Sequence, residues 1–110
     1  MSGLLLPKTV RIRDRAHKKR IKTLPCSFLL CRRCPSDPHH LTCSPEPKAR
    51  GLTAGDNWLV PLCRIHHSAA YPNSVHSTGR ELEWWHKMGI NPIALAERLW
   101  NETLELRSRK

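Results

Sequence analysis

The chain has 110 residues, a formal net charge of +10 and a hydrophobic fraction of 39%. This length suits one small domain. The hydrophobic core of such a domain is small and often needs a bound metal ion or a cross-link for stability. No run approaches the roughly 20 apolar residues of a membrane span, and Leu4-Leu5-Leu6 is too short for a secretory signal. The odd count of five cysteines argues against a disulfide framework. We therefore expect a soluble, cytoplasmic protein that does not bind membranes, with reduced thiols.

The positive charge is concentrated in residues 1–25, where eight Lys and Arg residues accompany only Asp14, a net charge of +7. Such a segment favours polyanions through counterion release, and in the cytoplasm we expect nucleic acid. A merely solubilising tail is the alternative. Residues 13–23 suit a short basic helix, which the Leu24-Pro25 pair would end. The expected nucleic-acid contacts are Arg11, Arg15, Lys18, Lys19 and Lys22.

The middle of the chain alternates short apolar runs with turns. We expect a turn over residues 35–38 and short strands over residues 39–42 and 58–62. The segment between them, residues 43–55, has the composition of a loop. A helix should begin near residue 63 and run toward residue 70.

The last third of the chain predicts two helices. The first covers residues 80–88 and ends at Gly89, and Asn91 caps the second, with Pro92 in its first turn. The tail from residue 107 to 110 is expected to fray. Apolar residues at helical spacing should pack against the core, namely Leu82 and Trp85 in the first helix and Ile93, Ala96, Trp100 and Leu104 in the second.

Potential metal ligands are concentrated in residues 26–76, which hold all five cysteines and five of the seven histidines. In the first half of this stretch, either Cys26 with Cys31 or Cys31 with Cys34 can form a zinc half-site, and the second pair has the commonest spacing. Cys63 and His66 supply another pair, also separated by two residues. Two half-sites about thirty residues apart indicate a structural zinc site. Isolated buried cysteines are the alternative.

The histidines suit a different task. A catalytic metal keeps positions open for water and phosphate, and phosphodiester hydrolysis also needs a general base near neutral pH. Adjacent strand residues point to opposite faces, so His39 and His40 need a distorted backbone to serve one site. One of them would then bind the metal and the other would activate water, with His67 completing the metal ligands. A plain zinc finger is the alternative.

Two runs carry a resemblance to a known family: Pro-Ser-Asp-Pro-His-His-Leu over residues 35–41, and Val-Pro-Leu-Cys-Arg-Ile-His-His over residues 60–67. Together they resemble the HNH, or His-Me finger, endonuclease superfamily, most of all its small phage- and prophage-associated members and the RecA-dependent nuclease group. Supporting similarity extends over roughly residues 11–100. The resemblance implies a ββα-metal fold with a zinc knuckle, and DNA cleavage with a divalent ion such as Mg²⁺, Mn²⁺ or Ni²⁺.

The resemblance also implies roles for individual residues. His40 matches the general base, and Asn57 matches the residue that orients it, with Asp56 as the alternative because Asn57 lies one residue too far from the following cysteine. His39 and His67 match ligands of the catalytic metal, and His76 is a further candidate ligand. The resemblance favours one set of structural zinc ligands, with Cys34 as the alternative to the first: Cys26, Cys31, Cys63 and His66.

These inferences predict an α+β fold forming one structural domain with three parts. The parts are a basic arm (residues 1–25), a zinc knuckle with a ββα-metal core (residues 26–76) and two C-terminal helices (residues 77–110). The expected function is metal-dependent cleavage or nicking of DNA with low sequence specificity. A zinc-stabilised DNA-binding module without nuclease activity is the alternative, and a protein-interaction adaptor is a third reading.

Overall fold

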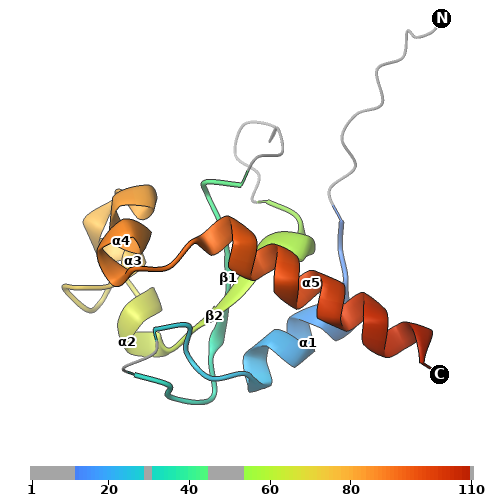
Figure 1. Cartoon of the computed structure of the whole chain (residues 1–110). Coiled ribbons are helices and arrows are strands. Elements are labelled where there is room, and N and C mark those ends of the chain that lie inside the picture. The colour runs from blue at the N-terminus through green and yellow to red at the C-terminus, as the bar shows by residue number, and fades with distance from the viewer. Residues whose placement is uncertain (1–11, 29–30, 45–53, 110) are drawn as a thin grey trace, which may run out of the picture.

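A two-stranded antiparallel sheet forms the centre of the computed structural model, which describes residues 12–28, 31–44 and 54–109 (Figure 1). Five α-helices and one short 3-10 helix surround this sheet within those residues. The fold is therefore a small α+β architecture, as the sequence predicts. No helix in the described ranges is both long enough and apolar enough to cross a membrane.

The basic helix α1 (Arg15–Thr23) is present and ends at Leu24, before Pro25, as predicted. Asp14 caps it, because the Asp14 carboxylate accepts the backbone N–H of His17 at 2.9 Å. His17 and Ile21 are fully buried, so α1 packs against the sheet instead of extending as a free arm. The predicted contact residue Arg11 lies outside the described residues.

Strand β1 (Asp37–His40) pairs antiparallel with β2 (Leu59–Leu62), and His39 lies opposite Val60. The predicted turn over residues 35–38 is wrong in its second half, because the backbone there already pairs with Leu62 and Pro61. A 3-10 helix, η1 (Asp56–Trp58), precedes β2. All four residues of β2 are buried. Most of the predicted loop, residues 45–53, lies outside the described residues.

The helix after β2 is shorter than predicted. Helix α2 (Arg64–His67) makes one turn and stops at Ser68, whose backbone is extended. A further single turn, α3 (Val75–Thr78), was not predicted; Ser74 caps it by accepting the backbone N–H of Ser77 at 3.1 Å. Gly79, with φ of 67°, ends α3, since this left-handed conformation favours glycine.

Helices α4 (Glu81–Met88) and α5 (Pro92–Ser108) complete the chain. Gly89 ends α4, and Asn91 caps α5 by accepting the Ala94 N–H at 3.1 Å, both as predicted. Helix α5 lies across β2 and η1 and extends beyond the predicted fraying point (Figure 1). There Arg107 pairs with Asp14 at 2.5 Å, which holds the end of α5 to the start of α1.

The packing face of α5 differs from the predicted stripe. Its buried residues are Pro92, Ala96, Leu99 and Thr103, whereas Leu104 is 42% exposed. In α4, Trp84 and Trp85 are buried while Leu82 is 64% exposed. The buried tryptophans lie in the main core with Val60 and Leu62 of β2 and with Leu41, which follows β1.

Candidate functional site

Four residues form a sulfur-rich group, here called the sulfur cluster, in which one ligand atom of each lies within 4.8 Å of the others: Cys26, Cys31, Cys63 and His66. The sulfurs of Cys31 and Cys63 lie 3.6 Å apart, and His66 Nδ1 lies 3.2 Å from the sulfur of Cys63. A tetrahedral zinc ion, with bonds of about 2.3 Å to sulfur and about 2.0 Å to nitrogen, separates its ligand atoms by about 3.5 to 3.8 Å. The cluster therefore has the ligand set of a closed zinc site, with His66 Nδ1 and the Cys63 sulfur slightly closer than a zinc ion would hold them.

Backbone hydrogen bonds shape the knuckle that carries Cys26 and Cys31. The N–H of Cys26 donates to the carbonyl of Arg33, and the N–H of Cys31 donates to the carbonyl of Phe28, both at 2.9 Å. Cys34, the alternative ligand, is exposed and lies outside the cluster. The geometry therefore groups Cys26, and not Cys34, with the other three residues.

Burial changes the pKa values of residues in the sulfur cluster. Burial raises the pKa of the Cys26 thiol to about 11 and lowers the pKa of His66 below its usual value. Burial would also raise the pKa of Cys31, but hydrogen bonds from the Arg33 backbone and the Cys63 thiol outweigh it and lower that pKa. A metal ion must therefore displace the proton of Cys26, and the energy of that exchange is coupled to folding.

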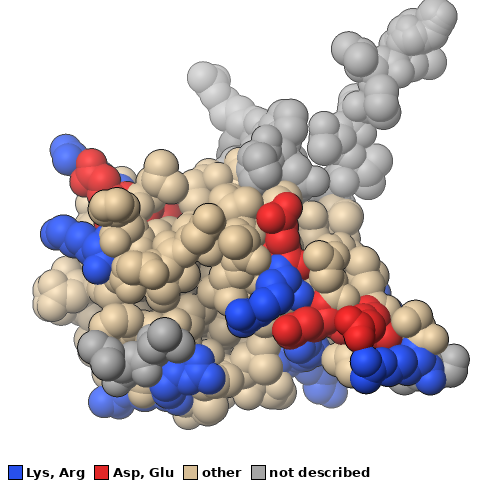
Figure 2. All heavy atoms as spheres, viewed as in Figure 1, with Lys and Arg blue, Asp and Glu red and all other residues tan. Residues whose placement is uncertain are grey.

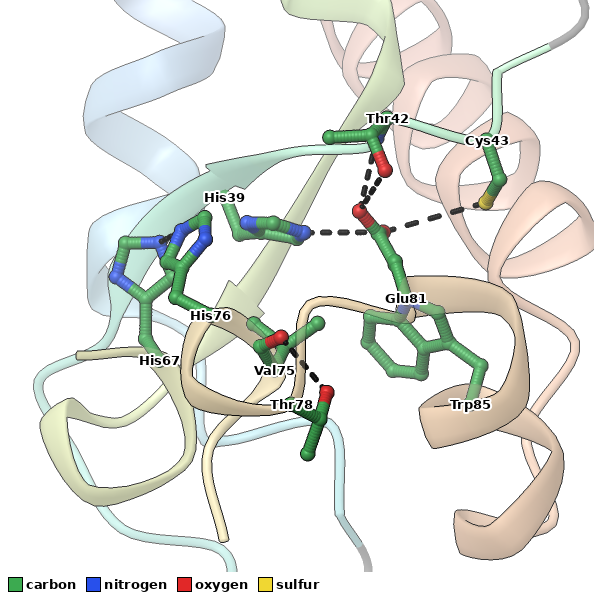
Figure 3. Close-up of polar contacts among 9 residues, drawn as sticks. All are labelled: His39, Thr42, Cys43, His67, Val75, His76, Thr78, Glu81 and Trp85. Carbon is green, nitrogen blue, oxygen red and sulfur yellow. Dashed lines mark hydrogen bonds and ion pairs between the residues drawn. The ribbon is translucent and has the colours of Figure 1, made fainter. Parts of the chain in front are cut away.

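A second group, here called the imidazole cluster, consists of His39 on β1, His67 on α2 and His76 on α3. The Nε2 atoms of His67 and His76 lie 3.1 Å apart, and the His39 ring centroid is 5.1 Å from each of the other two (Figure 3). Nitrogen ligands about 2.1 Å from one metal ion lie about 3.0 to 3.4 Å apart. His39 is buried and His76 is exposed, so the cluster is open to solvent on one side.

Two rings of the imidazole cluster, His67 and His76, favour the neutral form. Burial lowers the pKa of His67 and of His76, and the neighbouring His39 lowers both further. Neutral rings carry the lone pairs that a metal ion binds. The structure therefore brings together His39, His67 and the further candidate His76 as potential ligands of one ion.

Sequence reasoning missed two carboxylates behind these rings. Glu81 Oε2 lies 3.0 Å from His39 Nε2, and Asp37 Oδ2 lies 3.1 Å from His67 Nδ1. Asp37 precedes His39 by two residues on a strand, so the alternation of side chains could have placed both on one face. Glu81 gave no comparable signal, because it lies 42 residues from His39 in sequence.

Glu81 is buried and charged. Burial would raise its pKa, but the hydrogen bond from His39, together with those from Thr42 and Trp85, outweighs burial and lowers the pKa to about 2. A carboxylate that accepts a ring N–H raises the basicity of the other ring nitrogen and fixes the orientation of the ring. Both effects prepare an imidazole to bind a metal ion.

His40 lies on the other side of β1. Its Nε2 atom is 2.9 Å from Asp56 Oδ1, and β1 keeps a regular register at both histidines. The backbone distortion needed to bring His39 and His40 to one site is therefore absent. Asp56, the alternative, makes the contact predicted for Asn57, whose buried Oδ1 finds no hydrogen-bond partner among the described residues.

His40 and Asp56 lie in a basic groove of about 710 Å³ along α1. Three predicted contact residues line this groove, Arg15, Lys18 and Lys22, and Arg13 joins them. Lys19 is exposed on α1 but does not line the groove. On the face drawn in Figure 2, acidic and basic side chains alternate along α5. Helix α1 instead carries no acidic residue, so its positive charge is unbroken.

The fold and these side chains define a small α+β protein with two groups of potential metal ligands. Residues 1–106 match the family described as "Protein of unknown function (DUF968)", and the chain belongs to this family. It is also 34% identical over 74 residues to "Uncharacterized protein YdfU" of Escherichia coli (strain K12), a match that covers 67% of this chain and 20% of that protein. The matched part therefore spans about a fifth of this relative's length. No solved structure matches the chain.

Proposed function

We propose that this chain is a metal-dependent DNA endonuclease or nickase of the HNH type. One observation carries the proposal: an open imidazole cluster exists in addition to a complete sulfur cluster. A protein that uses zinc only to hold its fold needs one closed set of ligands and has no use for three further imidazoles directed at one another.

The order of the elements supports the same proposal. Strand β1 carries His39, strand β2 follows it, and helix α2 carries His67. This strand–strand–helix order with histidines on the first and last elements is the one that the resemblance implies for a ββα-metal core. In this proposal, structural Zn²⁺ is held by the sulfur cluster.

The imidazole cluster would hold the catalytic ion, Mg²⁺, Mn²⁺ or Ni²⁺, which when bound polarises the scissile phosphate and stabilises the leaving oxygen. The chain's own residues hold and orient the other reactants. Asp56 fixes the His40 ring through Nε2, which leaves Nδ1 to accept a proton from water. Arg15 and Lys18 in the basic groove would bind backbone phosphates.

His40 is the last residue of β1. DNA that crosses this end of β1 can therefore contact both faces of the sheet, the one that carries His40 and the one that carries His39. One part of the bound DNA would then lie in the basic groove, and the adjoining part would lie beside the open imidazole cluster. The DNA partner and the cytoplasmic location are parts of this proposal.

A second candidate is a zinc-stabilised DNA-binding module without nuclease activity. It is favoured by the direction of His40, which turns to Asp56 and the basic groove instead of the imidazole cluster. Both candidates require DNA binding, and only the first requires cleavage.

The deciding experiment is cleavage of supercoiled plasmid by the zinc-loaded chain with no further metal or with added Mg²⁺, Mn²⁺ or Ni²⁺. Wild type should nick or linearise the plasmid with at least one added ion, and His67→Ala should not. His86→Ala is the matched control, because His86 is exposed on α4 and belongs to neither cluster. Plasmid binding without cleavage under every metal condition would favour the binding module, and cleavage by His67→Ala would remove the imidazole cluster from the reaction.

A further inference from the structure

We infer that Glu81 is a positioning residue that presents His39 to a metal ion through Nδ1. The inference rests on the proposed metal-binding role of the imidazole cluster, and it concerns the chemical form of one ligand. Glu81 itself belongs to α4, outside the strands and the short helices that carry the three imidazoles.

Glu81 receives five hydrogen bonds at its two carboxylate oxygens (Figure 3). At Oε1, the backbone N–H of Thr42 donates at 2.9 Å and the Thr42 hydroxyl at 2.6 Å. At Oε2, the indole N–H of Trp85 donates at 2.8 Å, the Cys43 thiol donates at 4.0 Å, and His39 Nε2 lies at 3.0 Å. The carboxylate therefore connects β1 and the residue two positions after it to the start of α4.

These partners determine which nitrogen of His39 carries the hydrogen. A backbone N–H and an indole N–H can only donate, so Thr42 and Trp85 make each carboxylate oxygen of Glu81 an acceptor. His39 Nε2 faces one of those acceptors and must supply an N–H. A neutral imidazole has a single N–H, which leaves the lone pair on Nδ1. Figure 3 shows the other side of the His39 ring turned toward His67 and His76.

The same reasoning gives His67 the opposite form. Asp37 Oδ2 accepts Nε–H of Arg64 at 3.1 Å, and arginine has no acceptor, so Asp37 is also an acceptor toward His67 Nδ1. The lone pair of His67 is therefore on Nε2, the atom that lies 3.1 Å from His76 Nε2. The imidazole cluster thus offers an Nδ1 ligand from β1 and an Nε2 ligand from α2.

Glu81→Gln separates this role from a simple packing role. The amide keeps the shape of the side chain but must direct its NH₂ group toward either the Thr42 N–H or the Trp85 N–H. Either orientation places the NH₂ group against another N–H donor. In the second orientation the NH₂ group also faces His39 Nε2, so His39 can adopt the other tautomer, with its hydrogen on Nδ1. Glu83→Gln is the matched control, since Glu83 lies on the same helix with a side chain that is 69% exposed.

The experiment uses zinc-loaded full chain with a vacant imidazole cluster. Histidine ¹⁵N NMR should show His39 protonated at Nε2 and unprotonated at Nδ1 in wild type, and a mixture of the two tautomers in Glu81→Gln. Titration with Co²⁺ should show that Glu81→Gln binds the ion ten- to a hundredfold more weakly, as for other carboxylates behind metal-bound histidines. Glu83→Gln should match wild type in both measurements, and zinc content with thermal unfolding checks that each variant is folded.

A wild-type His39 protonated at Nδ1 would overturn the inference, as would a folded Glu81→Gln protein with unchanged tautomer and Co²⁺ affinity. If Glu81→Gln does not fold, the wild-type NMR result decides alone. Neither readout uses DNA, so a protein that fails to cut plasmid can still support or contradict the role of Glu81. Conversely, cleavage that depends on His67 but not on Glu81 would remove only this inference.

Discussion

His40 Nε2 lies 2.9 Å from Asp56 Oδ1, and the second oxygen of the same carboxylate accepts the Asp14 backbone N–H at 2.7 Å. The backbone N–H of Asp56 in turn donates to the carbonyl of Ile12 at 2.7 Å. One short segment of η1 therefore holds both the proposed general base and the start of the basic helix. Binding of the proposed polyanion along α1 would thus be physically connected to the orientation of the His40 ring.

We predict that His40→Ala lowers the rate of plasmid cleavage by roughly 10² to 10⁴, the usual contribution of a general base. Asp56→Asn should lower it less, because the ring remains but loses its charged partner. Zinc content should stay at the wild-type value, since His40 belongs to neither metal cluster. DNA affinity should change little, because Arg15, Lys18 and Lys22 of the basic groove remain. Single-turnover cleavage assays measure the effect, with His86→Ala as the control. Full activity in His40→Ala would exclude His40 as the base.

For the sulfur cluster, we predict that Cys63→Ser loses zinc and the folded state together, because metal binding supplies folding free energy in small metal-stapled domains. Cys34→Ser is a matched control with the same chemical change at an exposed cysteine outside the cluster. It should keep one zinc ion per chain and the wild-type unfolding midpoint. Metal analysis and circular dichroism provide the readouts. A folded, zinc-bound Cys63→Ser protein, or an unfolded Cys34→Ser protein, would show that the cluster is assigned incorrectly.

On helix α1, we predict that Lys18→Ala weakens DNA binding more than Lys19→Ala, although the two residues are adjacent. Lys18 lines the basic groove and Lys19 does not. Loss of one phosphate contact should reduce the slope of log affinity against log salt by about 0.9 for duplex DNA. Fluorescence anisotropy from low to moderate salt measures both slopes. Equal effects of the two substitutions would indicate that DNA does not lie in this groove.

The junction between α1 and α5 should be sensitive to acid through His17. Burial lowers the pKa of His17, Asp14 partly opposes this, and Arg20 and Arg107 lower it further. The unfolded chain therefore takes up the proton first. The stability that depends on neutral His17 is complete above the usual value of 6.5 and is lost as the pH falls below it.

His17→Gln tests this prediction, because an amide can keep a hydrogen bond to Thr103, which His17 Nδ1 contacts at 2.7 Å, without titrating. The unfolding midpoint of wild type should fall more steeply between about pH 7 and pH 5.5 than that of His17→Gln. His86→Gln, at an exposed position, should follow the wild-type curve. Parallel curves for wild type and His17→Gln would mean that His17 does not carry this acid sensitivity.

Local rules were sufficient for several parts of the fold. The Asn91-Pro92 start of α5 and the Gly89 end of α4 depend on backbone preferences that act within a few residues. Ligand spacing was similarly informative, because the pair Cys63 and His66 spans one turn that begins α2. In these cases the residues that decide the structure are close to it in sequence.

Contacts between residues far apart in the sequence explain the structural features that were predicted wrongly or missed. The buried face of α5 includes Thr103, which accepts a hydrogen bond from Arg20 of α1 at 2.9 Å, and hydrophobic periodicity cannot anticipate a buried polar residue. The ordered end of α5 depends on Arg107 and Asp14, which are 93 residues apart. Glu81 was missed for the same reason, since its partner His39 is on another element. Such pairings become visible only when the chain is folded.

His66 and His67 are consecutive residues of α2, yet the first belongs to the sulfur cluster and the second to the imidazole cluster. A single helical turn has almost no stability of its own in water. A metal ion bound by His66 would stabilise this turn and so fix the position of the neighbouring His67 ring. Loading should consequently be sequential, with the sulfur-bound ion arriving first, and a chelator strong enough to extract that ion should disable the second centre as well.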